Sequence, residues 1–306
     1  MSDLSIQSEA YDPSTYWTAP AKNFRSSVRL RLQHQLWYST TGSLLDYRVK
    51  TSIKRGEHLK LADLGCGNGA WLINLSEELS NDRFRFQLEG YDINETNFPL
   101  PAFLPKSIRL SKLDILSKEL PDDITGTFDI VCIRAFSSII FNNDTKPLLS
   151  SVLALLKPGG WVQWEEMGPD FIVKTPSPEQ SKGSCEMLAQ LMKRGQDTQG
   201  MKLDFVREFY QHLDDAGFQD VHVCEHGIPK QHYQGWTENF LMIWEEAASF
   251  HPPMTDSNKE TVTREFWEQV FTEAVRETEQ GVVLHRGCIR TVIGRKPLES
   301  SSESLS

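Results

Sequence analysis

The segment that most constrains the fold is a glycine-rich turn between an apolar strand and a helix. Its sequence, LADLGCGNG, spans residues 61–69 and runs through Asp63 into glycines at positions 65, 67 and 69. Glycines let the backbone turn tightly and approach a ligand closely, and the helix that follows offers unpaired N–H groups. The segment therefore predicts a nucleoside-cofactor site at the end of a strand. The alternative is an ordinary strand-to-helix turn.

Apolar periodicity around this turn predicts alternating strands and helices. Such alternation is typical of an α/β fold with a mostly parallel, doubly wound sheet, in which ligands bind beyond the carboxyl ends of the strands. We expect two helices within residues 24–50 and further helices over 70–79, 148–156, 185–194, 205–216 and much of 231–280. We expect strands over 60–64, 86–91, 108–113, 128–133, 161–165 and 221–224, and a final strand within 282–294.

The same pattern suggests a division of the chain. Residues 1–54 are expected to form an N-terminal arm and helices that cap the substrate, and residues 55–297 the main domain. That domain would carry helical cap insertions at about residues 170–200 and 231–280. The tail, residues 298–306, is polar and serine-rich and is expected to be disordered.

Acidic residues end the next two strands. Asp92, followed by Ile93, ends the second predicted strand, where a carboxylate can accept hydrogen bonds from both ribose hydroxyls. Asp114 ends the third, where it can accept from an adenine amino group while Leu113 and Ile115 pack against the ring. The alternatives are a turn-forming aspartate for Asp92 and a helix cap for Asp114.

The glycine loop is also compatible with a dinucleotide, because the segment from Gly65 to Ala70 fits the pattern GxGxxA. Asp63 argues against NAD or FAD, since a carboxylate at the strand end would repel a pyrophosphate. S-adenosylmethionine instead carries an ammonium and a sulfonium group, which favour a nearby anion. The residues therefore favour the methyl donor.

Two further segments support this interpretation. FDIVCIRAF (residues 128–136) resembles the fourth-strand motif of class I S-adenosylmethionine-dependent methyltransferases, and LKPGGWVQWEE (156–166) resembles their turn into strand five. The resemblance covers about residues 55–170. It implies a Rossmann-like sheet of seven strands with helices on both faces and an antiparallel last strand, here Leu284 to Arg295.

The resemblance also implies roles for individual residues. The methionine part of the cofactor would be lined by Asp63 and the three glycines, Gly65, Gly67 and Gly69, with Arg134 facing its methionine end. Asp92 would hold the ribose and Asp114 the adenine. S-adenosyl-L-homocysteine would be the product. For Arg134 the alternative is a solvent-facing arginine.

A narrower resemblance involves RLRLQHQLW (residues 29–37) and KPGGWVQWEE, which are similar to fungal secondary-metabolism methyltransferases and their regulator-like relatives. It implies O- or N-methylation of a small molecule such as a polyketide, alkaloid or peptide product. Two alternatives stay open. The chain could be a regulatory or interaction protein on the same fold, or a cofactor-assisted cyclase that transfers no methyl group.

Methyl transfer mainly requires positioning and exclusion of water, so a base is optional. His34 is the candidate base, because the pKa of histidine suits proton acceptance near neutrality; the alternative is a histidine hydrogen-bonded within the N-terminal helices. Glu165 or its neighbour Glu166 could polarise an acceptor; the alternative, for at least one of them, is an ordinary surface carboxylate. Aromatic side chains could form the walls of a pocket for an apolar or aromatic acceptor. The alternative is that these side chains pack in the core. The candidates are Trp17, Trp37, Trp236 and Phe240.

Composition limits other functions. The formal net charge of -10 argues against nucleic acid as a partner, because binding phosphates needs clustered Lys and Arg. Five cysteines without CxxC spacing, and an N-terminus without signal-peptide layout, predict a reduced cytoplasmic compartment. Apolar runs fall short of the roughly 20 residues needed to span a membrane. No metal site is expected, since His222, Cys224 and His226 form only a weak zinc pattern.

Overall fold

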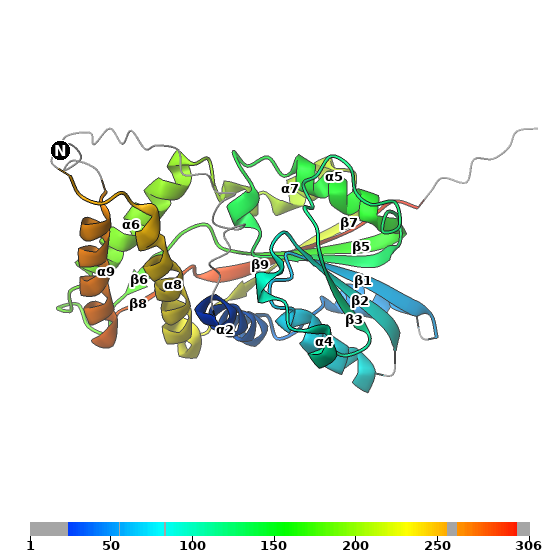
Figure 1. Cartoon of the computed structure of the whole chain (residues 1–306), viewed down its shortest axis with the longest axis horizontal. Helices are drawn as coiled ribbons and strands as arrows, with labels where there is room; N and C mark the ends of the chain where they lie inside the picture. The colour runs from blue at the N-terminus through cyan, green and yellow to red at the C-terminus, as the bar shows by residue number, and fades with distance from the viewer. Residues whose placement is uncertain (1–23, 55, 83, 256–261, 299–306) are drawn as a thin grey trace, which may run out of the picture.

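The structure is a computed structural model that describes residues 24–54, 56–82, 84–255 and 262–298. Figure 1 shows an elongated molecule with a twisted sheet toward one end and a group of helices at the other. Trp17, most of the N-terminal arm and the tail from residue 299 lie outside the described residues.

Seven strands form the main sheet, in the order β3-β2-β1-β4-β5-β9-β7. The first five strands of that order are mutually parallel, and β9 runs antiparallel to both β5 and β7. The predicted seven-stranded, mostly parallel sheet with an antiparallel last strand is thereby confirmed. The strands are β1 (His58–Leu64), β2 (Arg85–Asp92), β3 (Ile108–Lys112), β4 (Phe128–Arg134), β5 (Leu156–Met167), β7 (Gln219–Gly227) and β9 (Cys288–Arg295).

Helices cover both faces of the sheet, as predicted. Strand β1 shows why: Ala62 and Leu64 belong to one buried cluster, whereas Leu59 and Leu61 belong to another. A strand buried on both sides is apolar along its whole length, which explains the continuous apolar runs of the sequence. One face is covered by α5 (Lys146–Leu155) and α7 (Phe209–Asp215), and the other by α3 (Tyr47–Ser52) and α4 (Ala70–Asn81).

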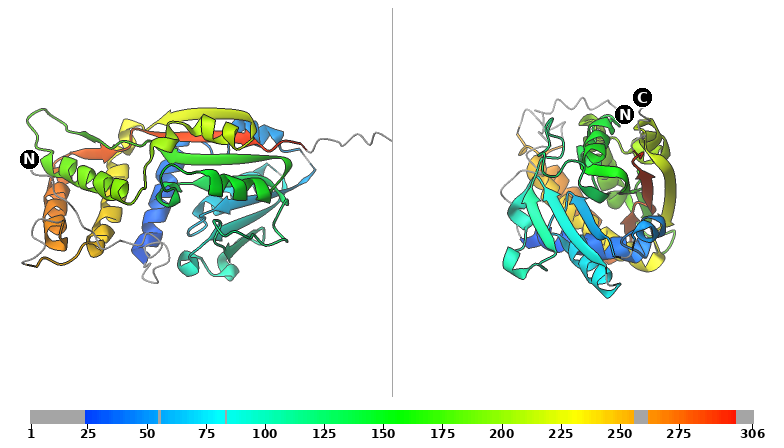
Figure 2. Two further views of the ribbon diagram at one scale, coloured as in Figure 1. Left: turned by 90° about the horizontal axis from the view of Figure 1, so that it is seen from above. Right: turned by 90° about the vertical axis from the view of Figure 1, so that its right-hand side faces the viewer.

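The remaining helices gather at one end of the sheet and are called the cap here. The cap comprises α6 (Gly183–Thr198), α8 (Tyr233–Ala247), α9 (Arg264–Glu279) and the two-stranded sheet of β6 (Ile172–Lys174) and β8 (Val283–His285). Figure 2 shows it beyond the ends of β5 and β9. Helix α2 (Phe24–Thr41) lies between cap and sheet and packs against both α8 and α4. The 3-10 turns are η1 (Glu95–Asn97), η2 (Pro101–Phe103), η3 (Ser137–Ile139), η4 (Asp204–Val206), η5 (Lys230–His232) and η6 (Ala248–Phe250).

Two predicted elements were wrong in detail. The final strand expected within residues 282–294 is broken at residues 286 and 287. Gly287 adopts a φ of 76°, which a strand does not allow. The buried side chain of Arg286 donates to the carbonyl oxygen of Pro169 at 2.7 Å. The part before the break, β8, therefore pairs with β6 and belongs to the cap. The single helix expected over residues 205–216 is divided into η4 and α7, which places both Phe205 and Phe209 against Trp164.

Among the described residues, no helix combines the length and apolarity that crossing a membrane requires. The same part of the chain contains no group of three His, Cys, Asp or Glu side chains placed to hold a metal ion.

Candidate active site

The glycine loop joins β1 to α4 and is fixed to the end of β2. The N–H groups of Gly65 and Cys66 donate to the carbonyl oxygen of Tyr91 at 2.7 and 3.0 Å. Gly65 has a φ of 70°, and a Cβ atom there would lie 2.1 Å from the ring of Phe136. Position 65 therefore excludes any side chain, both by backbone conformation and by space.

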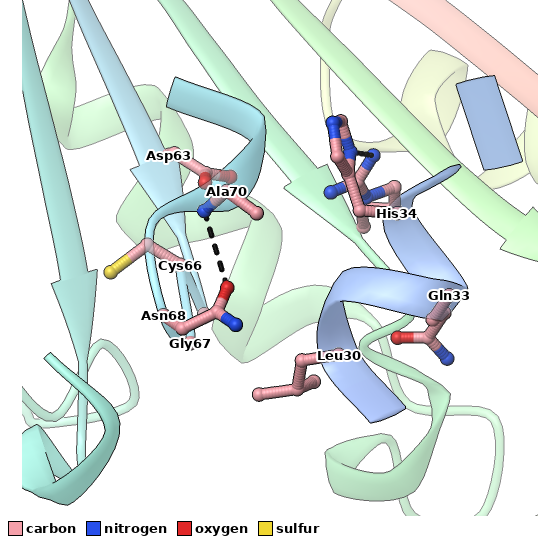
Figure 3. Close-up of a pocket in the computed structure, with 10 residues that line it drawn as sticks. Leu30, Gln33, His34, Asp63, Cys66, Gly67, Asn68 and Ala70 are labelled. Carbon is pink, nitrogen blue, oxygen red and sulfur yellow. Dashed lines mark hydrogen bonds between the residues drawn. The ribbon is translucent and has the colours of Figure 1, made fainter. Parts of the chain in front are cut away.

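Asn68 connects this loop to α2. Its amide nitrogen donates to the carbonyl oxygen of Ser27 at 3.0 Å, and its amide oxygen accepts from the N–H of Ala70 at 3.2 Å (Figure 3). The side chain thus satisfies a free N–H at the start of α4. We did not predict this role, although an asparagine between the glycines of the motif is a signal for a cap.

Asp92 shapes the loop from the end of β2. One carboxylate oxygen accepts from the N–H of Gly67 at 2.9 Å, and the other accepts from the N–H of Asn94 at 2.9 Å. An ionised carboxylate has about four acceptor positions, so two remain for the hydroxyls of a ribose. Asp92 is half-buried, which leaves it accessible to a ligand lying over the loop.

A pocket of about 40 Å³ lies between α2, the glycine loop and the end of β4 (Figure 3). Leu30, Gln33 and His34 form one wall, because residues spaced three and four apart share a face of a helix. Of the predicted site residues, the pocket brings together five: His34, Asp63, Gly65, Gly67 and Arg134. The residues that we missed are Leu30, Gln33, Cys66, Asn68 and Ala70.

Arg134 is the cation at the centre of this site. It ends β4, in register with Glu165 on β5, and it lines the pocket together with Asp63. Burial raises the pKa of Asp63 to about 7, against the opposing effect of the positive charge on Arg134. Burial likewise raises the pKa of Glu165 to about 7, again opposed by Arg134. Half-buried Arg134 therefore lies near two buried acids, Asp63 and Glu165.

Both glutamates near the end of β5 are buried, so the expectation of a surface carboxylate for one of them was wrong, and the two differ in their contacts. Glu165 accepts from Gln163 at 3.1 Å and from Thr291 at 3.3 Å. Glu166 accepts from the N–H of Phe136 at 2.5 Å and from the indole of Trp164 at 3.0 Å. Glu166 thus holds the segment after β4, whereas Glu165 lies beside Arg134. Burial raises the pKa of Glu166 to about 7.

His34 has a partner at each ring nitrogen. Its Nδ1 lies 3.1 Å from a guanidinium nitrogen of Arg134, and its Nε2 lies 3.0 Å from the side-chain amide of Asn74. Burial, and then the charge of Arg134, lower its pKa to about 3. The arrangement matches the alternative of a hydrogen-bonded histidine, while the role of a base stays a prediction.

The predicted ribose and adenine residues, Asp92 included, do not line the pocket, although Asp92 contacts the glycine loop that does. Asp114 is exposed and accepts from the N–H of Leu116 at 3.0 Å in a turn. No helix begins there, so the alternative of a helix cap is wrong. Ile115 is buried in the core cluster under α5, and Leu113 packs at the edge of that cluster. Ile93 is half-buried beside Asp92. Gly69 adopts a φ of 71° and begins α4 without lining the pocket.

The aromatic residues predicted as substrate walls lie in the core between α2 and the cap. Trp37 and Trp236 are almost wholly buried, with ring centroids 6.0 Å apart in an edge-to-face arrangement, and Phe240 packs on Trp236. None of the three lines the pocket. Their placement matches the core-packing alternative. The indole N–H of Trp236 has no hydrogen-bond partner among the described residues. That of Trp37 makes no hydrogen bond of ordinary geometry there, but it lies near enough to Glu165 to lower the pKa of that acid.

Comparison with known proteins decides the family. A family model described as a methyltransferase domain matches residues 36–223, more than half of the chain. The chain belongs to this family. It is therefore an S-adenosylmethionine-dependent methyltransferase, and the match includes the glycine loop, Asp92 and Arg134.

Similar curated proteins are fungal methyltransferases. Methyltransferase grgD from a Penicillium species is 28% identical over 209 residues, which cover 67% of this chain and 69% of that protein. N-methyltransferase tcpN from Claviceps purpurea (strain 20.1) is 30% identical over 139 residues, which cover 45% of this chain and 47% of that protein. The alignment to tcpN thus spans about half of each chain.

Among solved structures, a likeness exists to phosphoethanolamine N-methyltransferase 2 from Haemonchus contortus in complex with S-adenosyl-L-methionine. It has a TM-score of 0.45 and 15% identity, and it covers 82% of this chain and 52% of that chain. A likeness at this level assigns no site residue in the present chain.

Proposed function

We propose that this methyltransferase methylates an oxygen or nitrogen atom of a small molecule in fungal secondary metabolism. The observation that carries the proposal is the pocket in which the glycine loop, Asp63 and Arg134 meet under α2. The names of the relatives, of which tcpN is called an N-methyltransferase, favour nitrogen as the acceptor atom.

The residues of the pocket fit the methyl donor chemically. Asp63 offers a carboxylate for its ammonium, and Arg134 offers a guanidinium for its carboxylate. Beside the pocket, Asp92 offers acceptors for the donor's ribose. When bound, S-adenosylmethionine supplies an activated methyl carbon on a sulfonium. Because the pocket is narrow and Leu30 lies 3.1 Å from a Cβ placed on Gly67, the Leu30 side chain has to turn aside when the donor enters.

The protein then has to hold the acceptor in line with the methyl carbon and exclude water. A bound donor would supply its methyl carbon to the acceptor's lone pair as the carbon–sulfur bond breaks, with S-adenosyl-L-homocysteine as the product. The acceptor's proton passes to solvent or to a nearby base. In this proposal the α2 face carrying Gln33 borders the reaction centre. Glu165 is buried beside Arg134, and burial raises its pKa to about 7.

The proposal is tested in two steps. Calorimetric titration of the full chain with S-adenosylmethionine and with NAD measures cofactor choice, and we expect the sulfonium compound alone to bind. Metabolite extracts from strains with and without the protein are then compared by mass spectrometry. We expect compounds in the first strain that carry one additional methyl group.

The two alternatives give different results in the same experiments. A cyclase would change a metabolite without adding a methyl group. A regulatory protein would change metabolite amounts even when Gly67→Arg abolishes cofactor binding. Either result would contradict methyl transfer, and binding of NAD without S-adenosylmethionine would contradict the cofactor assignment.

A further inference from the structure

We propose that His34 is a positioning residue whose neutral imidazole holds the guanidinium of Arg134 in the orientation that binds the carboxylate of the methyl donor. The inference rests on the proposed function, because it concerns how the cofactor pocket is organised. It assigns to His34 a role other than that of a base.

Hydrogen-bond chemistry determines the state of the ring. A guanidinium only donates, so Nδ1 of His34, 3.1 Å from Arg134, has to accept. A neutral imidazole then carries its single hydrogen on Nε2, which faces the amide of Asn74 at 3.0 Å. The structure places the amide nitrogen of Asn74 at this position. Two donors cannot meet there, so the proposal requires the Asn74 amide to be turned over by 180°, with its oxygen accepting from Nε2–H. The chain of donors runs from Arg134 through His34 to Asn74.

This chain links three elements that the sequence separates widely. His34 lies on α2, Arg134 ends β4, and Asn74 lies on α4, which begins at the glycine loop. Asn74 therefore fixes the imidazole relative to the loop, and the imidazole fixes Arg134. Figure 3 shows the His34 side chain projecting from α2 at the edge of the pocket.

Arg134 needs such an anchor. Within the described part of the chain it makes no ion pair of 4.0 Å or less, and the contact with His34 is the single hydrogen bond of its side chain. The Trp37 ring lies 5.7 Å from the guanidinium carbon, while Asp63 and Glu165 attract the group from other sides. Without His34 the guanidinium could turn toward either acid. Its remaining donors face no protein acceptor among these residues and are available to an anion.

The state of the ring suits this role at physiological pH. Burial, followed by the charge of Arg134, lowers the pKa of His34 to about 3. The imidazole therefore remains neutral and keeps Nδ1 as an acceptor. Protonation would instead place two cations in contact.

Two substitutions separate the contacts of the ring. His34→Asn places an amide oxygen near the position of Nδ1, so it can still accept a hydrogen bond from Arg134. His34→Gln has a longer side chain that reaches toward Asn74, so it loses the hydrogen bond from Arg134. We expect the KM for S-adenosylmethionine to stay within about twofold of wild type for His34→Asn and to rise about tenfold for His34→Gln. We expect kcat at saturating donor to change less than about twofold in both.

A truncated ligand provides the control. 5′-Methylthioadenosine lacks the amino-acid part of the donor, so its affinity, measured by calorimetry, should be equal in wild type, His34→Asn and His34→Gln. Because the proposed effect passes through Arg134, the double variant Arg134→Gln/His34→Gln should bind S-adenosyl-L-homocysteine no more weakly than Arg134→Gln alone.

Each result bears on the proposal. Equal losses in the Asn and Gln variants, or a loss that extends to 5′-methylthioadenosine, would overturn it. A collapse of kcat with unchanged KM would show that His34 acts as a base. If His34→Gln does not fold, Asn74→Ala takes its place, with an expected rise in KM of about threefold and no effect on the truncated ligand. Failure of the wild-type protein to bind S-adenosylmethionine would instead contradict the proposed function.

Discussion

At the scale of single residues, the site is defined by three acids that the fold buries. Asp63 faces Arg134, Glu165 accepts from two polar side chains, and Glu166 accepts from a backbone N–H and an indole. Burial raises the pKa of each acid to about 7. Because these pKa values lie near neutrality, both cofactor binding and stability should change over the physiological pH range.

The affinity for S-adenosylmethionine should fall as the pH drops below about 7. Protonation of Asp63 removes the negative charge that attracts the ammonium of the donor, so the dissociation constant rises with acidity. Calorimetry at about pH 6 and about pH 8 measures the effect. Asp63→Asn should bind weakly at both pH values, and any remaining pH dependence in that variant belongs to the other buried acids, Glu165 and Glu166. A wild-type affinity that does not change with pH would contradict the assignment.

Glu166→Gln should stabilise the protein at high pH and leave it nearly unchanged at low pH. The folded-state pKa of Glu166, about 7, lies above its ordinary value of 4.5. The protonated acid therefore contributes stability that is fully present at low pH and is lost as the pH rises through about 7. Glutamine keeps the acceptor oxygen for Phe136 and Trp164 without a charge.

Thermal denaturation at about pH 5 and about pH 8 gives the comparison for this variant. Exposed Glu179→Gln serves as the matched control and should change the melting temperature at neither pH. A larger destabilisation of Glu166→Gln at the higher pH than at the lower would show that the ionised carboxylate is required.

Asp92→Ala should weaken S-adenosylmethionine binding by about tenfold to a hundredfold, because charge-assisted hydrogen bonds contribute about 1.5–3 kcal/mol. The structure adds that the variant also releases the N–H of Gly67. Asp92→Asn, with one acceptor oxygen, should lie between wild type and Ala. Calorimetry measures the affinity, and circular dichroism checks the fold. A folded Asp92→Ala protein with wild-type affinity would refute the ribose assignment.

At the scale of elements, the sequence predicted the loop between β1 and α4 well and the contribution of α2 poorly. The loop is encoded locally, since its glycines, Asp63 and the helix that follows are neighbours in sequence. The α2 wall depends on contacts with residues about 40 positions later, such as Asn68 with Ser27. Spacing shows that Leu30, Gln33 and His34 share a face, but only tertiary structure shows what that face meets.

The same limit applies to the aromatic residues. The side chains of Trp37, Trp236 and Phe240 suit a substrate-binding wall and a hydrophobic core equally well. Only their burial and their contacts in the structure distinguish these two roles. The hydrogen bond from the N–H of Phe136 to Glu166 could not be predicted from the sequence either, because Phe136 lies in the segment after a different strand, β4.

Gly65→Ala should lower the free energy of unfolding more than Gly56→Ala, although both glycines have a positive φ. Alanine at either position costs about 1–2 kcal/mol for its left-handed backbone. At Gly65 the new methyl group would also displace the ring of Phe136, which adds about 1–3 kcal/mol. Gly56→Ala is the control, since nothing lies within 4 Å of its Cβ position.

Urea denaturation measures the free energy of unfolding of both glycine variants, and calorimetry measures cofactor affinity. Only Gly65→Ala should lose affinity for S-adenosylmethionine. Equal destabilisation by the two substitutions would show that Phe136 moves aside without cost.

At the scale of the whole molecule, we propose that cap and sheet are distinct stability units, each with its own core. Buried tryptophans dominate the cap, where the indole of Trp267 donates to the carbonyl oxygen of Trp244 at 2.9 Å. Glu277 of α9 joins two cap helices, because its carboxylate accepts from the N–H groups of Ser184 and Cys185 at the start of α6. Removing Glu277 therefore tests whether the cap can loosen alone.

Glu277→Ala should destabilise the cap by about 1–3 kcal/mol, since it leaves the α6 N–H groups unpaired. Hydrogen exchange followed by mass spectrometry should show faster exchange in α6 and α9 and unchanged protection in β1 and β4. Exposed Glu279→Ala is the control and should change neither. Equal acceleration in the sheet would show that cap and sheet unfold as one unit.

The position of β9 has a consequence for how the protein is made. Among the described strands β9 is the last to leave the ribosome, yet it lies between β5 and β7 and is the sole partner of β7 in the sheet. During translation the nascent chain therefore carries two open strand edges until residues 288–295 emerge. Open edges recruit other chains, and pairing across long sequence separations is slow. Until that strand emerges, the edges of β5 and β7 that it later covers stay open to other chains, so late emergence of β9 lengthens the interval in which aggregation competes with folding.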